Sequence, residues 1–173
     1  VGILNAVPEN AFSEGVKGTY LAFDNFVSYL REMFDIWWNK YRDKIVVREL
    51  VDLLNAVRKN TPSKACYYQG NCMGKYLTVE PNGNLSACEK YVGDPNFLYG
   101  NIFNHNGIPD VLQNSSVFNS AWQYTENSTD NMKNCQWYEN VCQGACPHDR
   151  RINEFLNAEY DGSCCGLSPL LKD

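Results

Sequence analysis

Eight cysteines, all beyond residue 65, constrain the folding of this 173-residue chain more than any other feature of its sequence. Three of them fall in the stretch CQWYENVCQGACPHDR at 135–150, where Gly and Pro interrupt any long helix and polar residues argue against a central strand. The eight are Cys66, Cys72, Cys88, Cys135, Cys142, Cys146, Cys164 and Cys165. Four thiolates commonly hold one iron–sulfur cluster or one structural zinc ion, so the count predicts shared thiol sites.

Composition and charge exclude several functional classes. The net charge of -5 and the pI near 5.0 argue against binding to a nucleic-acid backbone, which requires a basic face. No apolar run approaches the roughly 18 residues that a membrane-spanning helix needs. The opening VGILNAVPENAF has neither the basic segment nor the long apolar stretch of a signal peptide. The sequence therefore predicts a globular protein with no nucleic-acid partner and no membrane association.

Two other uses of the cysteines compete with an iron–sulfur cluster. Glycosylation sequons at Asn84, Asn114 and Asn127 would suit an extracellular, disulfide-bonded binding domain, although the first 65 residues contain no cysteine to staple. A zinc-stabilised interaction module is the other alternative. Zinc ribbons favour C-x2-C pairs, whereas the gaps here include C-x5-C, C-x15-C, C-x6-C and C-x3-C. Zinc is thus the weaker fit.

The first third of the chain has helical periodicity. Apolar residues recur at steps of three and four from Thr19 to about Lys40, which predicts an amphipathic helix. The run IVVREL at 45–50 is expected to start as a strand and to continue into a second helix that ends in a basic turn near Asn60. Residues 1–4 are expected to form a short strand, and the change in composition near residue 62 predicts a domain boundary.

Beyond that boundary the expected elements are short. Two strands at 76–79 and 85–87 flank an Asn-Gly turn, which predicts a hairpin with Cys72 and Cys88 at the same end of the ribbon. His105 and His148 are expected in loops or at the surface. The remaining predictions are a strand at 100–103, helices at 108–113, 117–124 and 150–157, and a polar loop at 127–134.

Iron–sulfur cubanes tolerate the irregular cysteine spacing. Each thiolate binds a separate iron at a corner of a bulky cluster, so the ligands can come from loops with unequal gaps. Loops rich in Gly, Asn and Gln also offer backbone N–H groups that can donate to cluster sulfur. The spacing and the composition together favour iron–sulfur chemistry.

In order along the chain, these motifs resemble the auxiliary-cluster (SPASM) region of radical S-adenosylmethionine (SAM) enzymes. The run CQGACPHDR at 142–150 is similar to the CxGGCPxxR phrase of anaerobic sulfatase maturases and related peptide-modifying enzymes. The helix segment FDIWW at 34–38, followed by IVVREL, resembles the bridge that those enzymes place before the auxiliary domain. The other matching pieces are Cys66-x5-Cys72, Gly83-x4-Cys88 and YGNIF at 99–103.

The resemblance implies an α+β fold and a division of the chain into two parts. Residues 1–62 would hold the end of the radical SAM core and a helical bridge. Residues 63–173 would form a small, loop-rich, SPASM-like cluster-binding module with a β-hairpin and short helices. The CxxxCxxC motif of the catalytic cluster is absent, so the chain is expected to be a fragment that lacks the partial barrel and is not catalytic alone.

The resemblance also implies two 4Fe–4S clusters. The family pattern assigns the first to Cys66, Cys72, Cys88 and Cys146. It assigns the second to Cys135, Cys142 and one of Cys164 or Cys165. The family has a further thiol where this chain has Met132, so the second cluster would keep an open iron, take an oxygen ligand such as Asp130, or use both late cysteines.

The resemblance assigns one candidate catalytic residue and a cellular setting. Glu89 occupies the position of the proposed proton acceptor of the sulfatase maturases, where the family has Asp. In the full-length enzyme, SAM and the missing barrel would generate a radical that acts on a peptide or protein substrate. The auxiliary clusters would accept an electron or help to position that substrate. Oxygen-sensitive clusters imply a reducing cytoplasm.

Overall fold

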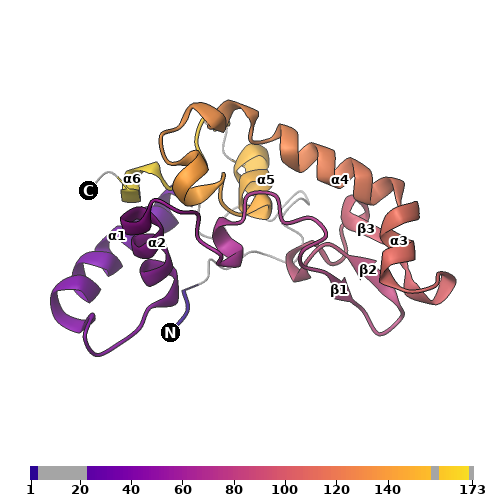
Figure 1. Cartoon of the computed structure of the whole chain (residues 1–173), viewed down its shortest axis with the longest axis horizontal. Helices are drawn as coiled ribbons and strands as arrows, with labels where there is room; N and C mark the ends of the chain where they lie inside the picture. Colours follow the sequence, from indigo (N-terminus) through magenta and orange to yellow (C-terminus); the bar gives the residue numbers. More distant parts are fainter. Residues whose placement is uncertain (4–22, 157–159, 172–173) are drawn as a thin grey trace. The chain divides into compact units, whose positions relative to one another are not determined.

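The computed structural model describes residues 1–3, 23–156 and 160–171, and within these ranges the chain forms two compact units (Figure 1). Unit one comprises Val1–Gly70 and Asn131–Asp173, and unit two comprises Asn71–Asp130. Helices and one small antiparallel sheet make up these units, which confirms the expected α+β class. These two units are defined by contacts within the chain. The predicted functional boundary near residue 62 stays a prediction.

The first helix of unit one, α1 (Phe23–Ile36), confirms the helix expected from apolar periodicity. Its buried stripe consists of Phe26, Val27 and Leu30, spaced as one face of a 3.6-residue helix. The predicted start at Thr19 lies outside the described residues. At its carboxyl end, α1 changes into a π-helical turn (Trp37–Tyr41), and the Trp37 indole N–H donates to the Ile45 carbonyl at 2.6 Å. That turn redirects the chain toward the second helix.

The second helix, α2 (Arg48–Lys59), packs Leu50, Leu53 and Ala56 into the core of unit one. It ends at Asn60, whose left-handed backbone (φ 49°) lets its N–H bond the carbonyls of Ala56 and Val57. The strand expected at 45–47 is wrong, because these residues form no strand. Residues 1–3 likewise form no strand, and residue 4 lies outside the described residues.

Two further helices belong to unit one. Helix α5 (Pro147–Leu156) confirms the predicted late helix but begins three residues before the predicted start at 150, with proline in the first turn, where its missing N–H costs no hydrogen bond. Helix α6 (Ser168–Leu171) was not predicted. The polar loop expected at 127–134 is wrong in part, because Asp130–Asn134 form a 3-10 turn that buries Met132.

Unit two is built on a three-stranded antiparallel sheet of β1 (Thr78–Val79), β2 (Asn84–Ser86) and β3 (Leu98–Asn101), in that order. The β1–β2 pairing confirms the predicted hairpin, and the Gly83 N–H closes its turn by donating to the Glu80 carbonyl at 2.8 Å. The third strand was predicted at 100–103 and lies two residues earlier.

Two helices complete unit two, α3 (Ile108–Asn114) and α4 (Ser116–Asn127), and both confirm predicted helices. The Ser115 side chain caps α4 by accepting from the Phe118 N–H at 3.0 Å. Side chains from the sheet and both helices share one apolar core. It consists of Met73, Leu85, Ala87, Tyr91, Phe97, Tyr99, Val111 and Ala121.

Among the residues that the structure describes, no helix combines the length and apolar character needed to cross a membrane.

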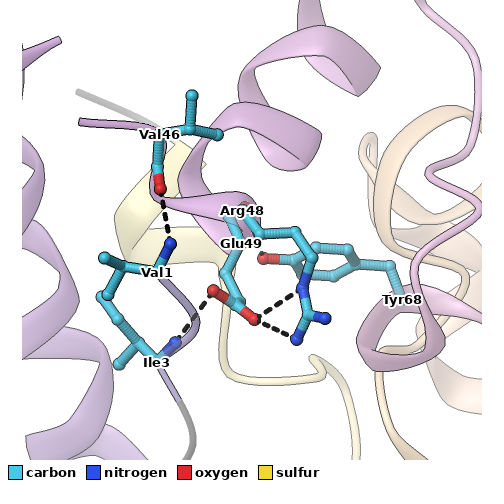
Figure 2. Close-up of polar contacts among 6 residues, drawn as sticks. All are labelled: Val1, Ile3, Val46, Arg48, Glu49 and Tyr68. Carbon is cyan, nitrogen blue, oxygen red and sulfur yellow. Dashed lines mark hydrogen bonds and ion pairs between the residues drawn. The ribbon is translucent and has the colours of Figure 1, made fainter. Parts of the chain in front are cut away.

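A buried carboxylate ties residues 1–3 to the start of α2 (Figure 2). Glu49, 5% exposed, accepts from the Ile3 N–H at 2.9 Å and from the Arg48 guanidinium at 2.7 and 3.1 Å. Its backbone carbonyl accepts from the Tyr68 hydroxyl at 3.2 Å. Burial alone would raise the pKa of Glu49, but the donors Ile3 N–H and Arg48 hold the pKa of this carboxyl below its usual range.

We predict that Glu49→Gln lowers the free energy of unfolding at pH 7 by about 1–2 kcal/mol, because the hydrogen bonds lose their ionised acceptor. A pKa lowered in the folded state stabilises the fold above the unfolded pKa, and this contribution is lost as the pH falls through the folded pKa. Urea unfolding at pH 7 and pH 3 measures both values. Glu32→Gln, at an exposed site on α1, is the control. An equal deficit at both pH values would contradict the role of the charge.

Candidate functional site

All eight cysteines lie within the described residues and are present as thiols rather than disulfides. Unit one holds six of them, and unit two holds Cys72 and Cys88. The sequence therefore directs most thiols to the part of the fold formed by the two chain ends. Those in unit one are Cys66, Cys135, Cys142, Cys146, Cys164 and Cys165.

Three thiols of unit one converge in its core, namely those of Cys142, Cys164 and Cys165. The Sγ atoms of Cys142 and Cys165 lie 3.5 Å apart, a hydrogen-bonding distance for thiols that is well beyond the roughly 2.05 Å of a disulfide. Cys165 also bonds the adjacent thiol of Cys164, which accepts from the Gly166 N–H at 3.3 Å. Cys142 and Cys165 are 2% and 4% exposed, so the group is shielded from solvent.

The three thiols share their protons unequally. The Cys165 thiol and the Gly144 N–H both donate to Cys142, and these bonds lower the pKa of Cys142 although burial opposes them. The pKa of Cys165 lies well above its usual range, because it donates to the sulfur atoms of Cys142 and Cys164 and is buried. In the metal-free protein, Cys142 is therefore the preferred thiolate, and thiolate is the form that binds metals.

The loop between Cys142 and Cys146 has an unusual backbone. Gln143, Gly144 and Ala145 have φ values of 49°, 85° and 57°, so three consecutive residues are left-handed. This conformation costs roughly 1–2 kcal/mol for each L-residue other than glycine. The Ala145 N–H donates to the Cys142 carbonyl at 2.7 Å, which closes the turn. Strain of this kind is typical of loops that hold functional groups.

Arg150, on α5, binds the carbonyl groups of this loop. Its guanidinium is 2% exposed, and Nη1 donates to the carbonyls of Gly144 at 2.6 Å and Ala145 at 3.0 Å. The same nitrogen reaches the Gly70 carbonyl at 3.5 Å. Gly70 itself (φ +63°) fits closely, because a Cβ there would lie 2.3 Å from the Gln143 carbonyl oxygen. The turn after Cys66 is thereby joined to the loop that carries Cys142 and Cys146.

Polar side chains are buried next to Cys146. His148 and Asp149 are 2% and 5% exposed, with His148 Nδ1 lying 3.6 Å from Asp149 Oδ1. The expected surface position of His148 is therefore wrong. Burial raises the pKa of Tyr67, and the negative charges of Asp149 and Cys146 raise it further. Sequence reasoning gave no role to Asp149 or Arg150, although both stand in the quoted CPHDR run.

Cys135 follows the 3-10 turn that ends at Asn134, and its N–H donates to the Met132 carbonyl at 2.9 Å. Met132, where the family pattern has a thiol, is 1% exposed and fills the apolar core of unit one. Asp130, the candidate oxygen ligand, is exposed. Met132 thus contributes to core packing.

In unit two, Cys72 and Cys88 both lie near the side chain of Tyr99. Burial raises the pKa of Tyr99, and the charges of both thiols raise it further, so each lies near its hydroxyl. This agrees with the prediction that the hairpin brings the two cysteines to one end. Glu89 follows directly, exposed at the start of a 3-10 turn (Glu89–Tyr91).

The thiols stand close together rather than arranged around an ion. Within the described ranges, no group of three or more His, Cys, Asp or Glu side chains is positioned to hold a metal ion. A bulky iron–sulfur cluster would require the sulfur atoms of Cys142 and Cys165 to separate around it. The donor chemistry nevertheless fits, because thiolates are the usual ligands of such clusters.

Comparisons with known families relate this thiol-rich α+β fold to iron–sulfur cluster-binding proteins. Residues 66–147 match the model of the SPASM family, described as an iron–sulfur cluster-binding domain. Residues 66–147 are therefore similar to the SPASM domain, and the predicted resemblance is confirmed. The disulfide-bonded and zinc alternatives receive no support from these comparisons.

Solved structures of anSMEcpe, an anaerobic sulfatase-maturating radical SAM enzyme, share this fold. The structure with bound AdoMet (S-adenosylmethionine) has a TM-score of 0.70 and 18% identity, covering 99% of this chain and 44% of that one. The structure with AdoMet and the Cp18Cys peptide has a TM-score of 0.69 and 18% identity, covering 99% and 45%. The chain therefore spans less than half the length of the proteins whose fold it shares.

We predict that Cys165→Ala raises the pKa of Cys142 in metal-free protein, because the thiol donor that stabilises its thiolate is removed. The ultraviolet absorbance of thiolate, followed against pH, measures the change. Cys135→Ala serves as the control, since Cys135 is not among the groups that shift the pKa of Cys142. A titration of Cys142 that is the same with and without Cys165 would contradict the hydrogen-bonded pair.

Proposed function

We propose that this chain is the auxiliary-cluster portion of a radical SAM enzyme that modifies a peptide or protein substrate. The observation that carries the proposal is the SPASM match over residues 66–147, a range that contains six of the eight cysteines. The other two, Cys164 and Cys165, contribute thiols to the group around Cys142. The proposal thus accounts for every cysteine in the chain.

The proposed ligands divide into two sets, each for one 4Fe–4S cluster. Cys66, Cys72, Cys88 and Cys146 form the first set. The second set has Cys135, Cys142 and a late cysteine, and its choice between Cys164 and Cys165 is open because both thiols lie next to that of Cys142.

The chain's own residues would prepare the second set for ligation. The Gly144 N–H favours the thiolate of Cys142, and the Gly166 N–H donates to Cys164. Met132 is packed in the core, and this supports a three-thiolate site with an open iron over a fourth protein ligand in the 3-10 turn. When bound, such clusters supply electron acceptance.

The remaining parts of the proposal concern the complete enzyme. Glu89 would take a proton from the substrate, for which its exposed carboxylate next to Cys88 is accessible. The relatives solved with bound Cp18Cys and Kp18Cys peptides support a peptide substrate. SAM chemistry would reside in a barrel that carries the CxxxCxxC motif, and oxygen-sensitive clusters favour a reducing cytoplasm.

We predict about eight irons and eight acid-labile sulfides per chain after anaerobic reconstitution, as two cubanes require. Cys72→Ala and Cys142→Ala should each lose about half of the iron, since they belong to different sets. Cys164→Ala and Cys165→Ala should differ, and the variant that loses iron identifies the ligand. Colourless, iron-free wild-type protein that stays folded would contradict the proposal.

We predict that Glu89→Gln in the full-length enzyme keeps the iron content and the ultraviolet–visible spectrum but lowers turnover by roughly 10²–10⁴-fold, the usual contribution of a general base. Glu80→Gln, in the hairpin turn, is a matched control that should retain activity. Iron analysis and product mass spectrometry measure the two effects. Turnover equal to that of the wild type would exclude Glu89 as the proton acceptor.

A further inference from the structure

We propose that Arg150 is a positioning residue that holds the Cys142–Cys146 loop in the shape required for cluster binding. The inference rests on the proposed function in that the loop is taken to carry ligands of both clusters. It assigns a role to a side chain for which neither the sequence motif nor the comparisons give one.

The loop needs an external support. Gln143 and Ala145 are L-residues held in the left-handed region, a conformation that their side chains disfavour. The Gln143 and Ala145 N–H groups close the turn by donating to the carbonyls of Tyr138 and Cys142. The carbonyls of Gly144 and Ala145 accept no helical hydrogen bond in this turn. Those two carbonyls are the ones that receive Arg150 Nη1, at 2.6 and 3.0 Å. The guanidinium thus compensates the backbone groups that the left-handed turn exposes.

The identity of the residue matters. A guanidinium is planar and always charged, and it offers five donors in a fixed geometry, whereas a lysine ammonium is a flexible point charge. Arg150 is 2% exposed, so its charge is kept in the interior, where hydrogen bonds to carbonyl dipoles are stronger than in water. Lysine could restore the charge at this site but not the same arrangement of donors.

Gly70 forms the other half of the contact. Its carbonyl accepts from the same Nη1 atom, and its missing side chain allows the Gln143 carbonyl to come close. A methyl group at Gly70 would meet backbone rather than a movable side chain, so the loop would have to shift. Substitutions at Arg150 and Gly70 should therefore disturb the same loop.

Alkylation of the metal-free full chain tests the role of Arg150 directly. Arg150→Met should raise the rate at which iodoacetamide modifies Cys142 and Cys146 by roughly tenfold or more, the change expected from losing buried charged hydrogen bonds. Arg150→Lys should lie between this variant and the wild type. Cys72 and Cys88, in unit two, provide the internal reference, and peptide mass spectrometry reads each site. Arg151→Met is the control on the same helix.

The selectivity of the effect separates positioning from general stability. Loss of stability in unit one would expose all of its buried thiols together, Cys165 included, whereas loss of positioning exposes Cys142 and Cys146 more than Cys165 and leaves Cys72 protected. Gly70→Ala, with Arg150 intact, should give the same selective pattern. After reconstitution, Arg150→Met should bind less iron and give an altered electron paramagnetic resonance spectrum, with partial recovery in Arg150→Lys.

The two proposals fail in different ways. Unchanged alkylation of Cys142 and Cys146 in both Arg150→Met and Gly70→Ala, or modification of all thiols alike, would overturn the role of Arg150. Wild-type protein that binds no iron would overturn the cluster assignment, whatever the alkylation rates show.

Discussion

The burial of cysteine side chains in the apolar core is the constraint on which unit one depends. Cys142 and Cys165 belong to the same packed cluster as Phe26, Leu53 and Tyr68. The core of this unit and its thiol site are therefore one structure. Ligand binding that moves these sulfur atoms must also move core contacts, so cluster loading and folding are energetically coupled.

Two contacts between charged side chains and the backbone brace unit one. A core that must open around a bulky group needs fixed points that do not move with it. Arg150 and the turn at Gly70 supply one such point at the Cys142–Cys146 loop, and Glu49 supplies another where α2 begins. Both rely on a charged group with low exposure that bonds backbone, and such contacts are costly to break.

Much of the fold could be predicted from local sequence signals. The spacing of Leu50 and Leu53 predicts α2, and the Asn-Gly turn predicts the hairpin of β1 and β2, because both signals act over a few residues. The resemblance to the SPASM region identified the cysteines as candidate cluster ligands. The π-helical turn at Trp37–Tyr41 could not be predicted, because it depends on how Trp37 packs and donates to Ile45.

The supports of the site lay beyond sequence reasoning for the same reason. Arg150 is the last residue of the recognised CQGACPHDR motif, yet its partners include Gly70, which lies eighty residues away in the chain. The need for glycine at position 70 likewise depends on the close approach of the Gln143 carbonyl, which only the folded chain reveals. A late cysteine pair also left the ligand ambiguous, since both Cys164 and Cys165 fold against Cys142.

Proton release links the thiol group to the conditions under which it can bind a metal. Ligation requires thiolates, and the hydrogen bonds within the group favour the thiolate of Cys142 at the expense of Cys165. The thiolate of Cys142 therefore forms more readily than that of Cys165. If Cys165 is the ligand, loading at this site should weaken steeply as the pH falls. If Cys164 is the ligand, Cys165 can keep its proton and donate to the bound thiolates, as it does to Cys142 in the structure. The two possible ligands therefore predict different pH dependences of cluster loading.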